Sequence, residues 1–242
     1  MNFVSGEVIA VDKPLGWTSF DVVKRLRGAI QRRLDIKKFK VGHAGTLDPL
    51  ATGALLVCTG RATRRIEELQ SGEKEYIATI RLGATTPSFD LETEIDARFP
   101  TEHITPSLIS EALKNFKGPI LQVPPVFSAV KVDGKRAYKF ARKGKEVELK
   151  PKQLVISDIE MLAFEEDVLT IRVVCSKGTY IRALARDIGR ALQSGAYLIA
   201  LRRTRVGDYD QSKLLSVEDA ISLIANTPLE FPDDWQHPTA GK

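Results

Sequence analysis

The stretch Val41-Gly42-His43-Ala44-Gly45-Thr46-Leu47-Asp48-Pro49-Leu50-Ala51-Thr52-Gly53 runs directly into the apolar segment Ala54-Leu55-Leu56-Val57-Cys58. The apolar segment predicts a buried strand, so the preceding residues form a loop that enters the core. Glycines in the loop allow backbone angles and close approaches that other residues resist. Pro49 favours an extended conformation for the residue before it, Asp48. We therefore predict a constrained loop that presents one carboxylate in one direction.

Taken alone, Asp48 has a plainer interpretation. An Asp in a loop rich in Gly and Pro is more often a turn residue that bonds its own backbone. The loop by itself therefore does not assign a chemical role, and the rest of the chain has to be considered.

The composition is that of an ordinary globular protein. The 242 residues are 43% hydrophobic and 28% charged, which suits one large domain with a sizeable core. We find no segment of about 20 apolar residues that could span a membrane, and no basic, apolar signal peptide at the N-terminus. The two cysteines, Cys58 and Cys175, end apolar runs and are expected to be buried reduced thiols, which predicts a cytoplasmic protein. Three scattered histidines give no zinc-like spacing, so no metal is expected.

The distribution of charge is more informative than the net charge of +5. Residues 24–40 carry eight Lys or Arg against a single Asp, and residues 131–152 carry nine against three acidic residues. Residues 213–242 are acidic, with two Lys against five Asp or Glu. Two basic segments indicate a polyanionic partner. For either segment alone, a solvated charged face is the more common explanation.

Apolar periodicity predicts the elements around the loop. Strands are expected at 6–11, 73–83, 153–164, 168–176 and 198–207, with a hairpin over 118–138 that turns at Asp133-Gly134. The first helix, capped by Thr18 or Ser19, should bury Val22, Val23, Leu26, Ile30 and Leu34. Later helices are expected after Thr105-Pro106 with a stop at Gly118, after Thr179 as a cap, and over 217–225 with Ser216 as a cap.

Several motifs carry a resemblance to a known family. The loop G-H-A-G-T-L-D-P-L-A-T-G resembles, nearly letter for letter, the catalytic loop of the bacterial tRNA pseudouridine-55 synthases, the TruB family. K-P-x-G-x-T-S at Lys13, E-K-x-Y-x-A at Tyr76, C-S-K-G-T-Y-I-R at Tyr180 and Arg182, and L-R-R-x-x-V-G at Leu201 resemble further motifs of the same family. In Q-x-P-P-x-Y-S-A-x-K, Phe127 stands where the family has Tyr.

The resemblance implies a role for each of these side chains. Asp48 would be the catalytic residue, and Arg182 would pair with it. Tyr76 would stack on the target base, while His43 would fill the space that the base leaves. Tyr180 and Leu201 would line an apolar pocket, and Lys13 would support its wall. By sequence alone, His43 would be a loop residue that is solvated or bonded to backbone, and Lys13 and Arg182 would be surface charges.

The resemblance also implies a fold and a substrate. We expect the α+β pseudouridine synthase fold: a mixed, mainly antiparallel sheet with flanking helices and a central RNA-binding cleft. Residues 1–225 would be the catalytic domain, with a basic mobile insertion at about 120–152, and 226–242 a C-terminal tail too short for the PUA domain of many relatives. The activity would be isomerisation of uridine 55 in the T-arm of tRNA by a monomer, without cofactor, obligate protein partner or membrane.

The chemistry explains why a carboxylate is needed. Pseudouridine formation breaks the N1–C1′ bond of uridine, turns the base and joins C5 to C1′, so one group must act as nucleophile or base. Whether Asp48 attacks C1′, adds to C6 or removes a sugar proton stays open. Two other functions are also possible: a noncatalytic RNA-binding or tRNA-folding protein of the same fold, and a guide-RNA-dependent synthase.

Overall fold

The computed structural model describes every residue except 1, 129, 133–134, 138–139, 141–147 and 232–242. The chain forms two compact units. Unit 1 contains Met1–Lys74 and Arg202–Lys242, and unit 2 contains Glu75–Leu201. The predicted Asp133-Gly134 turn, the charged run 141–145 and most of the predicted tail lie outside the described residues.

Unit 1 is built on an antiparallel sheet. Strand β1 (Val8–Lys13) pairs with β3 (Ala51–Thr59), so that Lys13 lies opposite Gly53. β3 also pairs with β2 (Val41–Ala44) and neighbours β12 (Ala196–Val206), whose last five residues belong to this unit. The short β13 (Tyr209–Asp210) pairs with the end of β12 and is followed by the 3-10 turn η2 (Gln211–Lys213).

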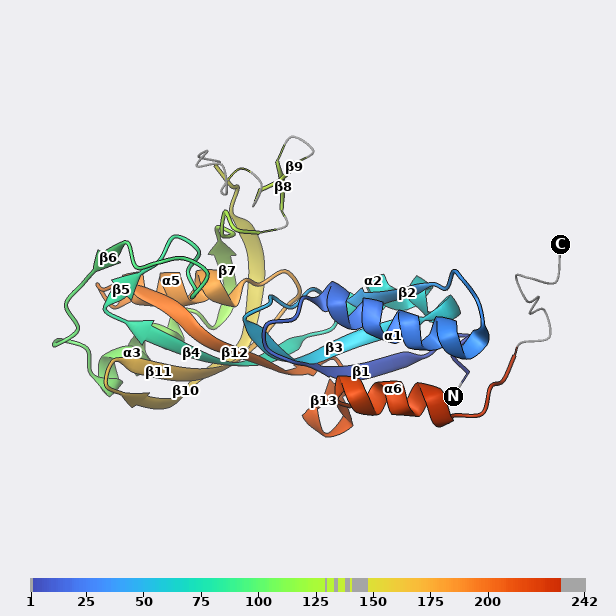
Figure 1. Cartoon of the computed structure of the whole chain (residues 1–242). Helices are drawn as coiled ribbons and strands as arrows, with labels where there is room; N and C mark the ends of the chain where they lie inside the picture. Colours follow the sequence, from blue (N-terminus) through green and yellow to red (C-terminus); the bar gives the residue numbers. More distant parts are fainter. Residues whose placement is uncertain (1, 129, 133–134, 138–139, 141–147, 232–242) are drawn as a thin grey trace. The chain divides into compact units, whose positions relative to one another are not determined.

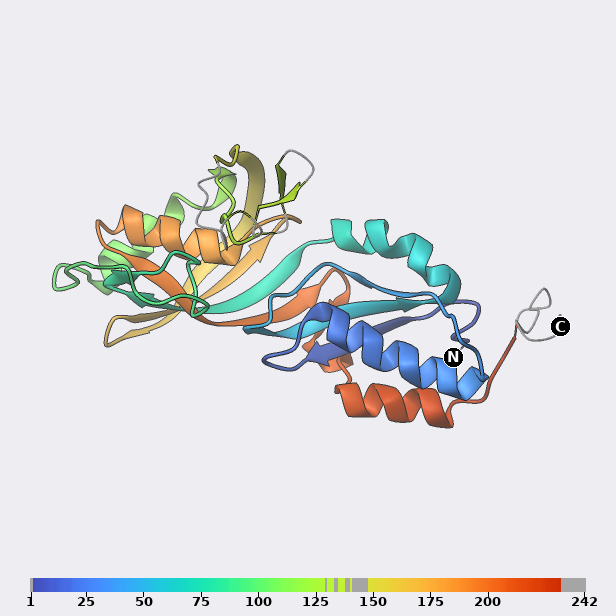
Figure 2. The ribbon, with the colours of Figure 1, turned by 45° about the horizontal axis from the view of Figure 1, so that its top comes forward.

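Helices cover both faces of this sheet. Helices α1 (Ser19–Leu34) and α6 (Val217–Asn226) lie side by side and share one core with β1 and β3 (Figure 1). On the opposite face, a smaller core is covered by α2 (Ile66–Ser71), which follows the 3-10 helix η1 (Gly60–Arg65) (Figure 2). The predicted inner face of the first helix is confirmed, because its buried residues include Val22, Val23, Leu26, Ile30 and Leu34.

Unit 2 holds a second part of the sheet, in the strand order β12, β4, β11, β10, β7. These are the first residues of β12 with β4 (Lys74–Leu82), β11 (Val168–Cys175), β10 (Lys152–Glu165) and β7 (Gly118–Gln122). β10 pairs antiparallel with both β11 and β7. Burial alternates along β4, so Tyr76, Ala78, Ile80 and Leu82 share the buried face as predicted.

Among the described residues of unit 2, two helices and two short strand pairs accompany the sheet. Helix α3 (Pro106–Lys114) begins at the predicted Thr105 cap and ends with Asn115, before the predicted stop at Gly118, which instead begins β7. Helix α5 (Ile181–Ala191) buries a row of apolar residues at helical spacing, Ile181, Leu184, Ala185 and Ile188, and several residues beside this row. The small strands are β5 (Ala84–Thr85) with β6 (Ala97–Arg98), and β8 (Lys131–Val132) with β9 (Lys135–Arg136).

The predicted α+β class with a mainly antiparallel sheet is confirmed. Both cysteines are buried free thiols, as expected from the apolar runs that they end. Within the described residues, no helix combines the length and the apolar character needed to cross a membrane.

Candidate active site

The loop that carries Asp48 is shorter than the sequence indicated. Residues 41–44 form strand β2 and residues 51–53 already belong to β3, because β2 pairs with β3 and extends the sheet. His43 therefore lies on a strand, opposite Val57, and not on a loop. The loop proper is 45–50, and it joins two neighbouring antiparallel strands. This geometry fixes both ends of the segment that presents Asp48.

A buried arginine holds the loop from within the core. Arg203 is 1% exposed and donates from Nε to the carbonyl of Ala54 at 2.7 Å. Its two terminal nitrogens donate to the carbonyls of Thr46 at 3.4 Å and Gly45 at 3.2 Å. The guanidinium thus ties strand β3 to the first residues of the loop, because its planar fork offers donors in several directions.

Gly53 allows this arrangement. Its φ is 101°, and a Cβ built there would lie 2.2 Å from the carbonyl oxygen of Arg203. A larger residue would therefore push apart the two segments that meet at this point. This is the close backbone approach for which the sequence predicted a glycine.

The middle of the loop is attached to the segment before and at the start of α1. The Ser19 hydroxyl accepts from the amide of Leu47 at 2.8 Å and donates to the carbonyl of the same residue at 3.1 Å. The amide of Gly16 donates to the carbonyl of Pro49 at 2.9 Å. Asp48, which is half-buried, is therefore flanked on both sides by anchored peptide groups.

Lys13 is a buried cation of the same site. It has no exposed surface, and its Nζ donates to the carbonyls of Pro14 at 2.9 Å and Trp17 at 2.7 Å, with Pro49 at 3.5 Å. Burial lowers its pKa to about 8, the Asp48 carboxylate opposes this shift, and the Arg203 guanidinium adds to it. The alternative that Lys13 is a surface charge is therefore wrong.

The surroundings of His43 lower the pKa of its imidazole. Burial is the main cause, the charge of Arg203 adds to it, and a hydrogen bond with the backbone of Gly45 opposes the shift. The Nδ1 atom is buried and makes no hydrogen bond within the described residues. The ring is half-buried and lies on β2, so the expected loop position is wrong, whereas the bond with the backbone agrees with one of the two plain interpretations.

Arg182, in unit 2, is also buried rather than exposed. It lies in the first turn of α5, with its Nε 3.5 Å from a carboxylate oxygen of Asp90. The terminal nitrogens donate to the carbonyls of Ser88 at 3.3 Å and Phe127 at 3.0 Å. Both members of the Arg182–Asp90 pair have nearly inaccessible side chains, so each charge depends on the other.

The start of α5 is not capped as predicted. The N-cap is Tyr180, without a side-chain cap, and the Thr179 hydroxyl instead donates to the carbonyl of Ser176. The buried side-chain amide of Gln122 holds the N-cap residue in place: its Oε1 accepts from the Tyr180 amide at 2.9 Å and its Nε2 donates to the Tyr180 carbonyl at 3.2 Å. A side chain 58 residues away therefore fixes the backbone that presents Arg182.

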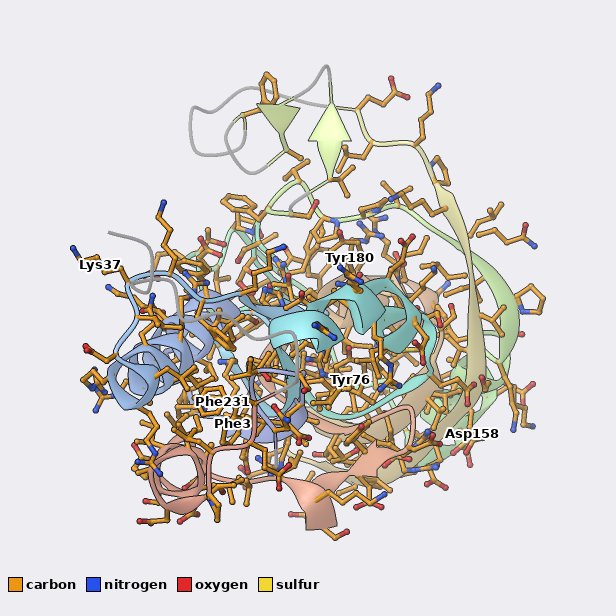
Figure 3. The ribbon with its side chains drawn as sticks, turned by 90° about the vertical axis from the view of Figure 1, so that its right-hand side faces the viewer. Phe3, Lys37, Tyr76, Asp158, Tyr180 and Phe231 are labelled. Atoms are coloured by element: carbon orange, nitrogen blue, oxygen red, sulfur yellow. The ribbon has the colours of Figure 1, made fainter. Side chains whose placement is uncertain are left out.

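The other expected pocket residues also belong to unit 2. Tyr76 on β4 and Leu201 on β12 are buried, and Tyr180 is half-buried (Figure 3). Unit 1 brings Lys13 and His43 to the Asp48 loop. Asp48 belongs to unit 1 and Arg182 to unit 2, and the ion pair predicted between them stays a prediction.

The sequence matches two known family models. Residues 31–181 match the family described as "TruB family pseudouridylate synthase (N terminal domain)", and residues 182–230 match "tRNA pseudouridylate synthase B C-terminal domain". The chain belongs to the TruB family. The resemblance found in the sequence is thereby confirmed.

Curated relatives of this TruB family chain share most of its length. The proteins named tRNA pseudouridine synthase B from Parabacteroides distasonis and Phocaeicola vulgatus are 64% and 66% identical to it, covering 97% and 90% of this chain and 100% and 93% of theirs. Among solved structures, a Cbf5-Nop10-Gar1 complex matches with a TM-score of 0.69 and 32% identity, over 92% of this chain and 55% of the matched chain. The chain therefore spans about half of the matched, longer chain. The two chains share a fold, and this fold is the one predicted from the sequence.

Four side chains of this TruB family chain were not singled out from the sequence. They are Asp90, Gln122, Arg186 and Arg203. Arg186 lies with its guanidinium 4.8 Å from the ring centroid of Phe89 and donates to the Val123 carbonyl at 3.0 Å, so it packs the segment that contains Asp90 against α5. Gln122 and Arg203 stand inside the motifs Q-x-P-P and L-R-R, which is the signal that could have found them.

Proposed function

We propose that this chain isomerises uridine to pseudouridine in tRNA, and that its target is uridine 55 of the T-arm. Membership of the TruB family supports the reaction, as do curated relatives named tRNA pseudouridine synthase B. The observation that carries the proposal is the Asp48 loop, whose carbonyls are bonded by the buried cations Lys13 and Arg203. A noncatalytic RNA-binding protein would have no need for such a positioned carboxylate.

Asp48 would act as the nucleophile or base of the reaction. A carboxylate that reacts while partly shielded from water must stay ionised, and nearby positive charge favours the ionised form. Lys13 and Arg203 supply such charge from within unit 1. Arg182 would add to it by pairing with Asp48, and its own pair with Asp90 would then place the guanidinium between two carboxylates.

The target base would leave its stack before reacting. Extrusion of a base costs a few kcal/mol, and stacking on an aromatic ring restores ~1–3 kcal/mol per base. Tyr76 would provide that stacking, and Tyr180 and Leu201 would exclude water from the glycosyl intermediate. A neutral His43, as its lowered pKa favours, would fill the space left by the base without placing a second cation there.

We further propose that residues 1–225 act as one catalytic domain, with the basic segment near 120–152 closing on the RNA. The chain would work in the cytoplasm as a monomer and without a protein partner. Each of these points depends on activity of the purified chain on bare tRNA, which a guide-RNA-dependent synthase would lack.

The test is carbodiimide mapping of pseudouridine in a tRNA transcript incubated with the purified chain. We expect one new reverse-transcription stop, directly 3′ of position 55, and none in a transcript with cytidine 55. The rate should fall by about 10³-fold or more for Asp48→Asn, in line with the loss of a group that provides acid–base or covalent catalysis. Unchanged turnover by Asp48→Asn, or absence of product with the unaltered chain, would refute the proposal.

A further inference from the structure

Exposed apolar side chains gather beside the Asp48 loop. Among the described residues of unit 1, four large apolar side chains are exposed: Leu15 at 64%, Phe20 at 57%, Leu50 at 39% and Phe231 at 46%. The first three lie on the segments that bond the loop, since Gly16 bonds Pro49 and Ser19 bonds Leu47. Single exposed apolar residues are ordinary, but here three lie within one residue of the groups that anchor the loop, since each is next to Gly16, Ser19 or Pro49 in the chain.

Phe20 differs from a chance exposed ring because a cation holds it. The guanidinium carbon of Arg27 lies 5.6 Å from the Phe20 ring centroid. Arg27 is itself fixed by donating to the Val41 carbonyl at 3.3 Å, while its Nε atom is buried and makes no hydrogen bond within the described residues. A cation–π contact at an exposed site is worth about 0.5–1 kcal/mol, so it favours one placement of the ring before any partner binds.

The surroundings of the ring are basic. Phe20, Lys24 and Arg27 follow one another at helical spacing on α1, so they share a stripe. The exposed Arg25, Arg32, Arg33, Lys37, Lys38 and Lys40 continue the positive charge along the same helix and the segment after it. The carboxylate of Asp21, in the same turn as Phe20, is bonded by the amide and hydroxyl of Thr18 in the helix cap. An exposed aromatic ring beside exposed cations suits a ligand with both flat apolar faces and phosphates.

We propose that Phe20 is a stacking platform for an unpaired nucleobase next to the target uridine, with Lys24 contacting the neighbouring phosphate. This inference rests on the proposed function, because it concerns the RNA loop that delivers the uridine to Asp48. Single-stranded RNA binds proteins by stacking of bases on aromatic rings and by phosphate contacts with Lys and Arg. A partner protein would match the apolar patch but would not account for the basic stripe that continues from it.

The experiment measures binding in a chain that cannot turn over. In the Asp48→Asn background, the affinity for a T-arm stem-loop RNA is determined at several salt concentrations for Phe20→Ala, Phe20→Trp, Lys24→Ala and Phe231→Ala. Stacking of one base is worth ~1–3 kcal/mol, so Phe20→Ala should lower the affinity by about 5- to 150-fold. Phe20→Trp should stay within about threefold of the parent, since it keeps a flat ring.

The salt dependence separates the two roles. Phe20→Ala should leave the slope of log affinity against log salt unchanged, whereas Lys24→Ala should reduce its magnitude by about 0.7–0.9, the contribution of one phosphate contact. Phe231→Ala is the matched control: this ring is 46% exposed, against 57% for Phe20, but its segment follows Thr227, whose carbonyl accepts from Arg33 near the opposite end of α1. Its affinity should not change.

A fluorescent base gives a direct readout. 2-Aminopurine placed beside the target uridine should be quenched on binding to the parent, and this quenching should be lost with Phe20→Ala. Affinity and quenching unchanged by Phe20→Ala would overturn the proposal. So would a change in the sedimentation of the free protein with RNA binding unaltered, because the patch would then serve self-association. Pseudouridine formation by the unaltered chain decides the proposed function independently of either result.

Discussion

Two buried arginines, one in each unit, hold the residues expected to react, and they do so in different ways. Arg203 donates to three backbone carbonyls around the Asp48 loop. Arg182 has a carboxylate partner, Asp90, as well as two carbonyls. The first arrangement fixes a backbone and leaves a positive charge, which adds to burial, the main cause, in lowering the pKa values of Lys13 and His43. The second compensates much of its own charge.

The difference teaches what each guanidinium contributes. A cation bonded to carbonyls is a fixed source of positive potential for a nearby anion. A cation paired with one carboxylate keeps spare donors but also protects that carboxylate from being buried alone. Removing Arg182 should therefore damage the protein through Asp90, whereas removing Arg203 should damage the shape of the loop.

The largest effect is expected at the Arg182–Asp90 pair. Arg182→Met leaves the Asp90 carboxylate buried without its cation, which costs about 3–5 kcal/mol of unfolding free energy. Turnover should fall by about 10³-fold, because the proposed partner of Asp48 is also lost. The double variant Arg182→Met with Asp90→Asn removes the stranded charge, so we expect it to recover much of the stability and none of the activity. Denaturant unfolding and single-turnover assays measure the two outcomes.

The double variant also tests whether Arg182 acts through its charge pair with Asp90, which is the proposed difference from Arg203. If stability does not recover when Asp90 becomes an amide, Asp90 does not depend on Arg182 for its charge. If activity recovers together with stability, Arg182 acts only by packing.

Arg203 gives the next largest effect. Arg203→Met leaves the carbonyls of Gly45, Thr46 and Ala54 without a donor, and each unsatisfied buried group costs about 1–3 kcal/mol. Relaxation of the loop should limit the loss to about 3 kcal/mol. Among the described residues, the bonds of Arg203 go to carbonyls and not to a carboxylate, so no second substitution should restore the lost stability. Hydrogen exchange should show faster opening in residues 44–54 than in unit 2, and equal opening in both units would contradict the assignment.

The sequence predicted what depends on local pattern and missed what depends on distant contacts. The alternation of Tyr76, Ala78 and Ile80 and the helical spacing of α1 follow from residues close in the chain. Arg182 was expected on the surface, because in the sequence it lies outside the row of apolar residues at helical spacing. Its burial comes from partners in segments 94 and 55 residues away, which no local pattern reports. The shared motifs identified the reacting residues, but not the side chains that hold them.

Lys13 extends the comparison to pH. Its pKa in the folded chain is about 8, below its ordinary value of 10.5, so between these values the unfolded chain binds more protons. The contribution of Lys13 to stability should therefore rise from pH 8 to pH 10.5. Activity should fall over the same range with an apparent pKa near 8, because a neutral amine no longer supports the Asp48 anion.

The control for this prediction is Lys13→Met. This variant should show neither the alkaline fall in activity nor the rise in stability that the unaltered chain shows. Its activity should already be lower than that of the unaltered chain at pH 7. Opposite trends in stability and rate would assign them to one amine. An alkaline fall that persists in Lys13→Met would assign it to another group.

The smallest effects concern how each unit starts the helix next to its site. Helix α1 is capped locally, since the Thr18 hydroxyl accepts from the Asp21 amide, while in α5 Gln122 from a distant strand bonds the backbone of the N-cap residue, Tyr180. Thr18→Ala should cost about 1 kcal/mol of unfolding free energy through the lost cap, and Gln122→Ala about the same through its lost hydrogen bonds. Their kinetic effects should differ: Gln122→Ala frees the backbone at Tyr180 beside Arg182 and should lower kcat several-fold, whereas Thr18→Ala should leave kcat unchanged, because Ser19 still anchors Leu47. Equal effects on kcat would mean that the bonds from Gln122 do not position Arg182 for the reaction.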